Sequence, residues 1–270
     1  MPITKAGDIN LEYFTEGSGP PLLMVMGFAG SAHTWGQPFV DALSRNFTTI
    51  RFSNRGTGDS DKPTEQTTIR MMADDAVALL DTLGIERPHV LGISMGGYIG
   101  QEFAINYPDR VNGLALGCTG VGGPTAVMAE PQTMQSMAFD PSLPIEEIIR
   151  KSWYALVSDS FQETGKAFLD DMAKTIMAHP TPMDTIVKQI GAIGGHSVAE
   201  RDAAITAPTL VIHGSVDRLV PPANGDQVAA AIRGAERKTI DGVGHMFFWE
   251  KPDEAARLVA EFVSRIPAAA

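Results

Sequence analysis

The chain has little cysteine, a deficit of basic residues and no long apolar run. Cys118 is the only cysteine among 270 residues, so an internal disulfide is excluded and nothing indicates an oxidising compartment. Lysine and arginine number 21 against 32 acidic residues, which gives a formal net charge of -11. Nucleic acids and anionic membranes bind basic surfaces, so neither is expected as a partner. No apolar stretch is long enough to span a bilayer.

Sequence signatures of metal and nucleotide sites are also missing. The histidines show neither His-x-His nor His-Glu-x-x-His spacing, and no Gly-x-Gly-x-x-Gly or Gly-x-x-x-x-Gly-Lys occurs. We therefore expect no metal ion and no other cofactor. The first residues, MPITKAGDIN, lack the apolar core of a secretion signal, so the sequence predicts a cytoplasmic protein. The oligomeric state stays open.

Short apolar runs alternate with amphipathic segments through much of the chain. Nearly continuous apolar runs indicate strands covered on both faces, as in a parallel sheet. Helical spacing of apolar side chains, with Gly84 and Pro108 as stops, indicates the helices between them. This alternation predicts an α/β fold with a doubly wound, mostly parallel sheet. The expected strands are residues 21–27, 47–53, 89–94, 111–117, 207–214 and 236–240, and the expected helices are residues 71–83, 95–107, 223–232 and 252–266.

Residues 121–205, which we call the insertion, break the alternation. This interval has no convincing strand, contains six prolines, and carries helical stretches at 145–157 and 165–178. We therefore expect residues 1–120 and 206–270 to form one core domain, into which the insertion adds a helical cap.

Six methionines and several aromatic residues gather in the insertion. Adaptable apolar side chains of this kind are typical of a cap that lines a substrate pocket. Met137 and Trp153 are the candidate pocket-lining residues. Packing within the insertion itself is the alternative interpretation.

Residues 92–96 read Gly-Ile-Ser-Met-Gly, after an expected strand and at the start of an expected helix. So sharp a turn strains the backbone of its central residue, and flanking glycines avoid colliding Cβ atoms. This is the general Gly-x-Ser-x-Gly nucleophile elbow, and it predicts Ser94 as a nucleophile. The helix start also offers free N–H groups to a developing oxyanion. The alternative is a glycine-rich turn in which Ser94 only caps the helix.

A serine hydroxyl needs a base, and the base needs an orienting acid. Asp217 and His245 both fall just beyond the ends of expected strands, where open α/β sheets build their sites. The chain order Ser94, Asp217, His245 is the one expected for this fold, so we predict these three as a catalytic triad. Asp241 is the alternative acid, and His213 is expected to be structural.

These features resemble the α/β-hydrolase superfamily over nearly the whole chain. Residues 27–30, Gly-Phe-Ala-Gly, are similar to the oxyanion loop of that family. The resemblance implies that the backbone N–H groups of Phe28 and Met95 hold the oxyanion. One position departs from the family pattern, because Met26 stands where a histidine is frequent and cannot anchor the loop through a ring hydrogen bond.

Residues 55–60, Arg-Gly-Thr-Gly-Asp-Ser, are similar to a stretch of the esterase, lactonase and haloperoxidase-like branch of the superfamily. Here we expect Arg55 and Asp59 to be ion-pair partners that fix the loop. Ser53 is the second departure, since the family usually has aspartate at that position.

The triad and the resemblance together predict a serine hydrolase that cleaves a small or medium, uncharged and mostly apolar ester or lactone through an acyl-enzyme. A C–C-bond hydrolase or a cofactor-free perhydrolase of the haloperoxidase-like type would use the same three residues, so these alternatives stay open. A ligand-binding sensor with little turnover is a further alternative.

Overall fold

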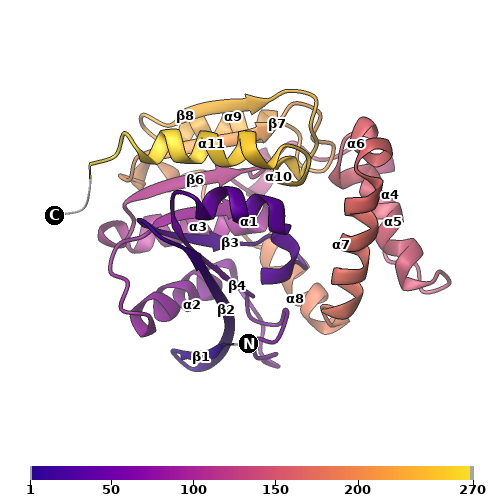
Figure 1. Cartoon of the computed structure of the whole chain (residues 1–270), viewed down its shortest axis with the longest axis horizontal. Helices are drawn as coiled ribbons and strands as arrows, with labels where there is room; N and C mark the ends of the chain where they lie inside the picture. Colours follow the sequence, from indigo (N-terminus) through magenta and orange to yellow (C-terminus); the bar gives the residue numbers. More distant parts are fainter. Residues whose placement is uncertain (1, 268–270) are drawn as a thin grey trace.

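The structure is a computed structural model that describes residues 2–267, and one eight-stranded sheet runs through it (Figure 1). The strands are β1 (Ile3–Ala6), β2 (Ile9–Gly17), β3 (Pro21–Val25), β4 (Thr48–Phe52), β5 (His89–Ile93), β6 (Gly113–Gly117), β7 (Thr209–Gly214) and β8 (Glu236–Ile240). Their order in the sheet is β1-β2-β4-β3-β5-β6-β7-β8. The pairs β1–β2 and β2–β4 are antiparallel, and the pairs from β4 to β8 are parallel. The expected α/β fold with a mostly parallel sheet is confirmed.

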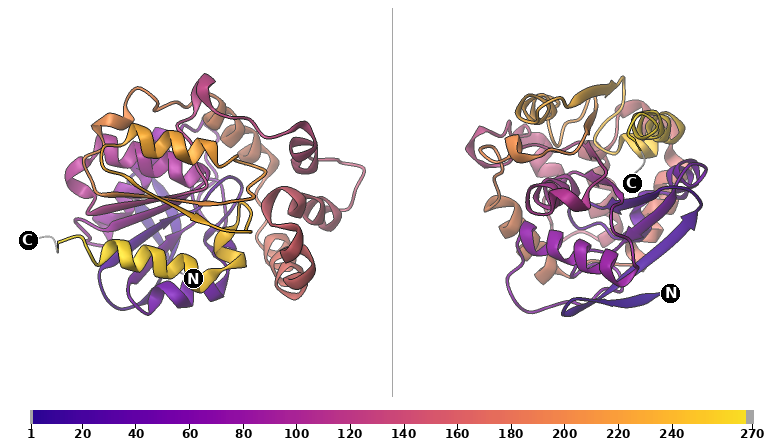
Figure 2. Two further views of the ribbon diagram at one scale, coloured as in Figure 1. Left: turned by 90° about the horizontal axis from the view of Figure 1, so that it is seen from above. Right: turned by 90° about the vertical axis from the view of Figure 1, so that its left-hand side faces the viewer.

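Helices cover both faces of this sheet (Figure 2). The core helices are α1 (Gln37–Ser44), α2 (Ile69–Thr82), α3 (Met95–Asn106), α9 (Ala223–Ala231), α10 (Phe247–Glu250) and α11 (Pro252–Val263). Two short 3₁₀ helices join them: η1 (Ala32–Trp35) and η2 (Pro108–Arg110). Helices α1, α10 and α11 pack in one apolar cluster, and α2, α3 and α9 pack in another on the opposite face.

Burial explains why the central strands could be read from the sequence. Every residue of β5, β6 and β7 is buried, as the nearly continuous apolar runs predict for strands covered on both faces. The six expected strands correspond to β3 through β8, and the four expected core helices to α2, α3, α9 and α11. The antiparallel β1–β2 pair and the helices α1 and α10 were not anticipated.

The insertion is helical between β6 and β7. It contains η3 (Gly123–Thr125), α4 (Pro131–Met137), α5 (Ile145–Leu156), α6 (Asp159–Thr164), α7 (Lys166–Ala178), α8 (Met183–Gly194) and η4 (Asp202–Ala204). Helices α4 to α7 stand at one end of the sheet, and α8 leads the chain back to the core (Figure 1). The two helical stretches expected here are α5 and α7, whereas the division into core and cap domains stays a prediction. No helix within residues 2–267 is long and apolar enough to cross a membrane.

Asp202 is a buried acid at the point where the insertion rejoins the core. Its exposed fraction is 0%, and neither carboxylate oxygen has a hydrogen-bond partner among the described residues. Burial raises the pKa of Asp202 to about 7, while Arg201 opposes and Glu102 adds to this effect. The folded chain therefore keeps a proton that the unfolded chain releases near the ordinary value of 3.8. Stability must then decrease as the pH rises through this window.

Replacing Asp202 with asparagine should remove this pH dependence, because an amide does not titrate. The free energy of unfolding of Asp202→Asn should change less between about pH 5 and about pH 8 than that of the wild type, as measured by urea denaturation. Asp253→Asn changes a carboxyl that is 78% exposed and should keep the wild-type dependence. Equal pH dependence in Asp202→Asn and the wild type would mean that Asp202 ionises freely in the folded protein.

Candidate active site

Ser94 lies at the turn where β5 passes directly into α3. Its backbone has φ 56° and ψ -120°, in a region that residues with a Cβ atom avoid, and its N–H donates to Gly117 O at 2.8 Å. The flanking glycines are sterically required. A Cβ atom on Gly92 would lie 2.2 Å from Gly96 O, and one on Gly96 would lie 2.0 Å from Val25 O. The backbone thus has the strained turn that the motif predicts, and nucleophilic action by Ser94 stays a prediction.

Asp217 and His245 are brought together in the buried interior beyond β7 and β8. His245 Nδ1 lies 2.8 Å from Asp217 Oδ2, and Asp217 Oδ1 accepts the N–H groups of Leu219 and Val220, each at 2.9 Å. Burial alone would raise the pKa of Asp217, but His245 and His213 hold it well below its usual value. Asp217 is therefore a carboxylate, and its bond to Nδ1 leaves His245 Nε2 available for proton transfer.

The other two candidate residues near this pair take different contacts. Asp241 Oδ1 accepts a hydrogen bond from Ser215 Oγ at 2.9 Å, and no bond joins Asp241 to His245 within residues 2–267. His213 Nε2 lies 2.8 Å from Val220 O and 3.3 Å from Asp217 Oδ2. The geometry favours Asp217 over Asp241 as the orienting acid.

Cys118 adds a thiol to the Asp217–His245 pair, and the ligand-type atoms of the three residues lie within 4.8 Å of one another. A metal ion would need the thiolate form of the cysteine. Burial and the neighbouring Asp217 carboxylate raise the pKa of Cys118 well above its usual value. Two of the three ligand-type atoms, Asp217 Oδ2 and His245 Nδ1, already lie within hydrogen-bond distance of each other, and a metal-free reaction stays a prediction.

Residues 27–30, the oxyanion loop of the sequence prediction, lie against the turn at Ser94. A Cβ atom on Gly27 would be 2.9 Å from Ile93 O and 3.0 Å from Ser94 Cβ. Neither the Phe28 nor the Met95 N–H donates a hydrogen bond to an acceptor within the described part of the chain. Free N–H groups beside the attacking atom are what an oxyanion hole requires. Their role at the oxyanion stays a prediction.

Ala29 ties this loop to the insertion. Its φ of 55° lies in the left-handed region, which alanine avoids. Its N–H donates to Gln189 Oε1 at 2.8 Å, and its carbonyl oxygen accepts from Thr181 Oγ1 at 2.8 Å. No sequence motif pointed to Thr181 or Gln189, because both lie more than 150 positions from Ala29 along the chain.

Glu12 of β2 compensates for the serine at position 53. Its Oε2 accepts from Ser53 Oγ at 2.6 Å and from the Asp59 N–H at 3.1 Å, and its Oε1 lies 2.8 Å from His33 Nε2. Burial would raise the pKa of Glu12, but the hydrogen bonds from His33 and Ser53 lower it to about 2. The carboxylate of Glu12, from the distant strand β2, therefore bonds to the loop at residues 53–59. By the resemblance described above, an aspartate at position 53 would supply that carboxylate from within the loop.

The expected ion pair between Arg55 and Asp59 is wrong. Arg55 instead makes two hydrogen bonds of 2.6 Å with the carboxylate of Asp75 on α2. The physical reason is burial, because both the Arg55 and the Asp75 side chains are only 6% exposed, whereas Asp59 is exposed. A buried guanidinium needs a buried carboxylate.

The two expected pocket-lining residues differ in their surroundings. Trp153 is 5% exposed and packs edge to face against Trp249, with ring centroids 5.9 Å apart. Met137 is half-buried at the end of α4. Trp153 thus joins the insertion to the core, and contact of either side chain with a substrate stays a prediction.

Helix α8 has an unusual distribution of side chains. Its buried residues include Thr185, Lys188 and Gln189, whereas Met183, Val187 and Ile190 are 45%, 62% and 57% exposed. The exposed residues of the helix thus include three large apolar side chains, together with the carboxylate of Asp184, which is 75% exposed.

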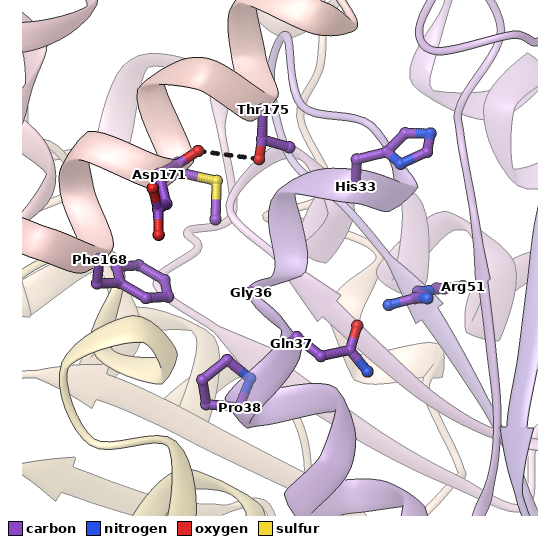
Figure 3. Close-up of a pocket in the computed structure, with 9 residues that line it drawn as sticks. His33, Gly36, Gln37, Pro38, Arg51, Phe168, Asp171 and Thr175 are labelled. Carbon is purple, nitrogen blue, oxygen red and sulfur yellow. Dashed lines mark hydrogen bonds between the residues drawn. The ribbon is translucent and has the colours of Figure 1, made fainter.

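A cavity of about 360 Å³ separates α7 from the segment formed by η1 and α1 (Figure 3). Its walls include no member of the predicted triad, so it is distinct from the candidate active site. The lining residues are His33, Gly36, Gln37, Pro38, Arg51, Phe168, Asp171, Met172 and Thr175.

Comparison with known proteins places the chain in a family. Residues 20–252 match the family described as alpha/beta hydrolase fold. A protein of Azorhizobium caulinodans named "Putative carbamate hydrolase RutD" is 29% identical over 98% of this chain and 99% of its own. The 2-hydroxy-6-oxo-6-phenylhexa-2,4-dienoate hydrolase of Comamonas testosteroni is 30% identical, with 95% of this chain and 92% of its own covered.

Among solved structures, the enol-lactonase from Burkholderia xenovorans LB400 has a TM-score of 0.84 at 25% identity, with 98% of this chain and 100% of its own covered. The matches in sequence and the match in structure therefore both cover nearly the full length of this chain. The chain belongs to the alpha/beta hydrolase family, and hydrolysis is the class of reaction that this membership supports.

Proposed function

We propose that the protein is a serine hydrolase that cleaves carboxylic ester or lactone bonds, with Ser94 as nucleophile, His245 as base and Asp217 as orienting acid. The observation that carries this proposal is the strained backbone of Ser94 together with the buried 2.8 Å bond between His245 and Asp217. Strain at a non-glycine residue persists only where surrounding contacts enforce it, and it concentrates at active sites.

In the proposed reaction, His245 Nε2 takes the proton of Ser94 Oγ as that oxygen attacks the carbonyl carbon. The N–H groups of Phe28 and Met95 donate hydrogen bonds to the carbonyl oxygen as it gains negative charge. His245 then gives its proton to the departing alkoxide, which leaves the acyl group on Ser94. Water activated by His245 releases the acid, and Ser94 regains its proton.

The surfaces of the protein favour an uncharged, mostly apolar substrate. The net charge of -11 disfavours anions on approach, and α8 exposes the apolar side chains of Met183, Val187 and Ile190. The likeness to an enol-lactonase supports a lactone or an ester as the bond that is cleaved.

A C–C-bond hydrolase is the second candidate. It is favoured by the relative from Comamonas testosteroni, whose name states hydrolysis of a hydroxy-oxo-dienoate. The dienoate carries a carboxylate, so its binding would have to overcome the acidic charge of this chain. No observation on the described residues favours a perhydrolase or a sensor.

A substrate panel separates the two candidates. The ratio kcat/KM should be at least about tenfold higher for the best uncharged ester or lactone than for 2-hydroxy-6-oxo-6-phenylhexa-2,4-dienoate. A carbamate belongs in the panel, because one relative is named for that bond. A higher kcat/KM for the dienoate than for every ester and lactone would favour the C–C-bond hydrolase and contradict the proposed substrate class.

Loss of the proposed nucleophile should abolish ester hydrolysis. Ser94→Ala should lower kcat on a p-nitrophenyl ester by about 10³-fold or more, as removal of a nucleophile does in well-studied hydrolases. Initial rates and urea unfolding curves measure activity and fold. Ser264→Ala, at the exposed residue that directly follows α11, is the matched control and should keep full activity. Activity of Ser94→Ala within about tenfold of the wild type would contradict the assignment.

The two aspartates near the base should differ strongly in their effect. Asp217→Asn should lower kcat by about 10⁴-fold, because the amide favours the wrong tautomer of His245. Asp241→Asn should stay within about threefold of the wild type, since Asp241 is bonded to Ser215 instead. Steady-state kinetics of both variants provide the comparison. A larger loss in Asp241→Asn would show that the acid is misassigned.

A further inference from the structure

Side chains of the insertion hold both polar backbone groups of Ala29. Gln189 Oε1 accepts the Ala29 N–H at 2.8 Å, and Thr181 Oγ1 donates to the Ala29 carbonyl oxygen at 2.8 Å. Ala29 directly follows Phe28, the residue whose N–H is proposed to bind the oxyanion. The bond to Gln189 fixes the peptide plane between Phe28 and Ala29, and this plane is joined at the Phe28 Cα atom to the plane that carries the Phe28 N–H. Fixing the first plane therefore limits how far the second can rotate.

The oxyanion loop has a strained backbone that contacts must hold in place. Ala29 has φ 55°, a conformation that persists only where contacts enforce it. Met26, just before the loop, has no ring N–H with which to hold it. Its side chain packs beneath Gly30 instead, where an added Cβ atom would lie 2.6 Å from Met26 Cγ.

The buried position of Gln189 lowers the stability of the fold. Its side chain is 1% exposed, and because a backbone N–H faces it, the atom that accepts must be Oε1. Its Nε2 is consequently a buried donor that has no acceptor among residues 2–267. An unpaired buried donor is unfavourable for stability, so stability alone does not explain this residue.

We propose that Gln189 and Thr181 are positioning residues, which hold the Phe28 N–H where the developing oxyanion accepts its hydrogen bond. The inference rests on the proposed function, and neither side chain needs to contact the reacting atoms. It makes the insertion part of the machinery that stabilises the transition state, in addition to any role in substrate selection.

Removing either bond should lower kcat and leave KM nearly unchanged, because an oxyanion donor acts mainly in the transition state. Gln189→Met and Thr181→Val should each reduce kcat by about 10- to 100-fold, with KM within about threefold. Two conservative single variants at the same positions should keep kcat near that of the wild type. Thr181→Ser keeps the hydroxyl donor, and Gln189→Glu keeps an acceptor oxygen in either protonation state.

Thr185→Val is the matched control, and Thr185 lies on α8 as Gln189 does. Thr185 Oγ1 donates to Gly56 O at 3.2 Å, so this variant also removes a bond between α8 and the core, but one that does not involve the oxyanion loop. Its kcat should stay within about twofold of the wild type. A second measurement is the inhibition constant of a trifluoromethyl ketone, which forms a tetrahedral adduct on the serine. This constant should rise in Gln189→Met and Thr181→Val in proportion to the loss of kcat/KM.

The outcomes distinguish this inference from the proposed function. If Gln189→Met and Thr181→Val keep kcat within about twofold of the wild type while Ser94→Ala is inactive, the positioning role is overturned and the function stands. An active Ser94→Ala overturns the function itself. An equal loss in Thr185→Val, with no rescue by Thr181→Ser or Gln189→Glu, would indicate general packing of α8 and would also overturn the positioning role.

Discussion

At Ser94 the chain leaves a fully buried strand and enters a helix within a single residue, and the backbone there is held at φ 56°. Among the described residues, Ala29 and Cys118 are the other non-glycine residues with positive φ. The three follow β3, β5 and β6, which are neighbours in the sheet. Each such residue costs about 1–3 kcal/mol, which only a rigid surrounding structure can sustain. The parallel sheet thus concentrates its strain at the edge where the chemistry is proposed.

Buried hydrogen bonds fix the orientations of the side chains and backbone groups at this edge of the sheet. The Asp217 carboxylate accepts two backbone N–H groups and faces the rings of His245 and His213, so its charge is stabilised without solvent. A hydrogen bond to a buried side chain also fixes the oxyanion loop, where Gln189 of the insertion accepts the N–H of Ala29. Core and insertion therefore meet at hydrogen-bonded groups, in addition to the apolar packing around Trp153.

The predictable features were those encoded in short stretches of sequence. The central strands are continuous apolar runs because both of their faces are buried, and Ser94 could be placed because its motif is local. Contacts between distant segments had no such signal. Glu12 reaches Ser53 across 41 positions and Gln189 reaches Ala29 across 160, while the expected Arg55–Asp59 pair failed because sequence proximity does not reveal burial. The β1–β2 pair was missed since β2 is only partly buried.

The central claim is that Ser94 is an activated nucleophile, and covalent labelling tests it most directly. The wild-type protein would be treated with an equimolar p-nitrophenyl phosphonate near neutral pH and analysed by intact mass spectrometry and peptide mapping. The account predicts one phosphonyl group per chain, located on Ser94, with labelling strongly slowed in Asp217→Asn because the base loses its orientation. A protein that stays unlabelled, or one labelled at a different serine, would contradict it.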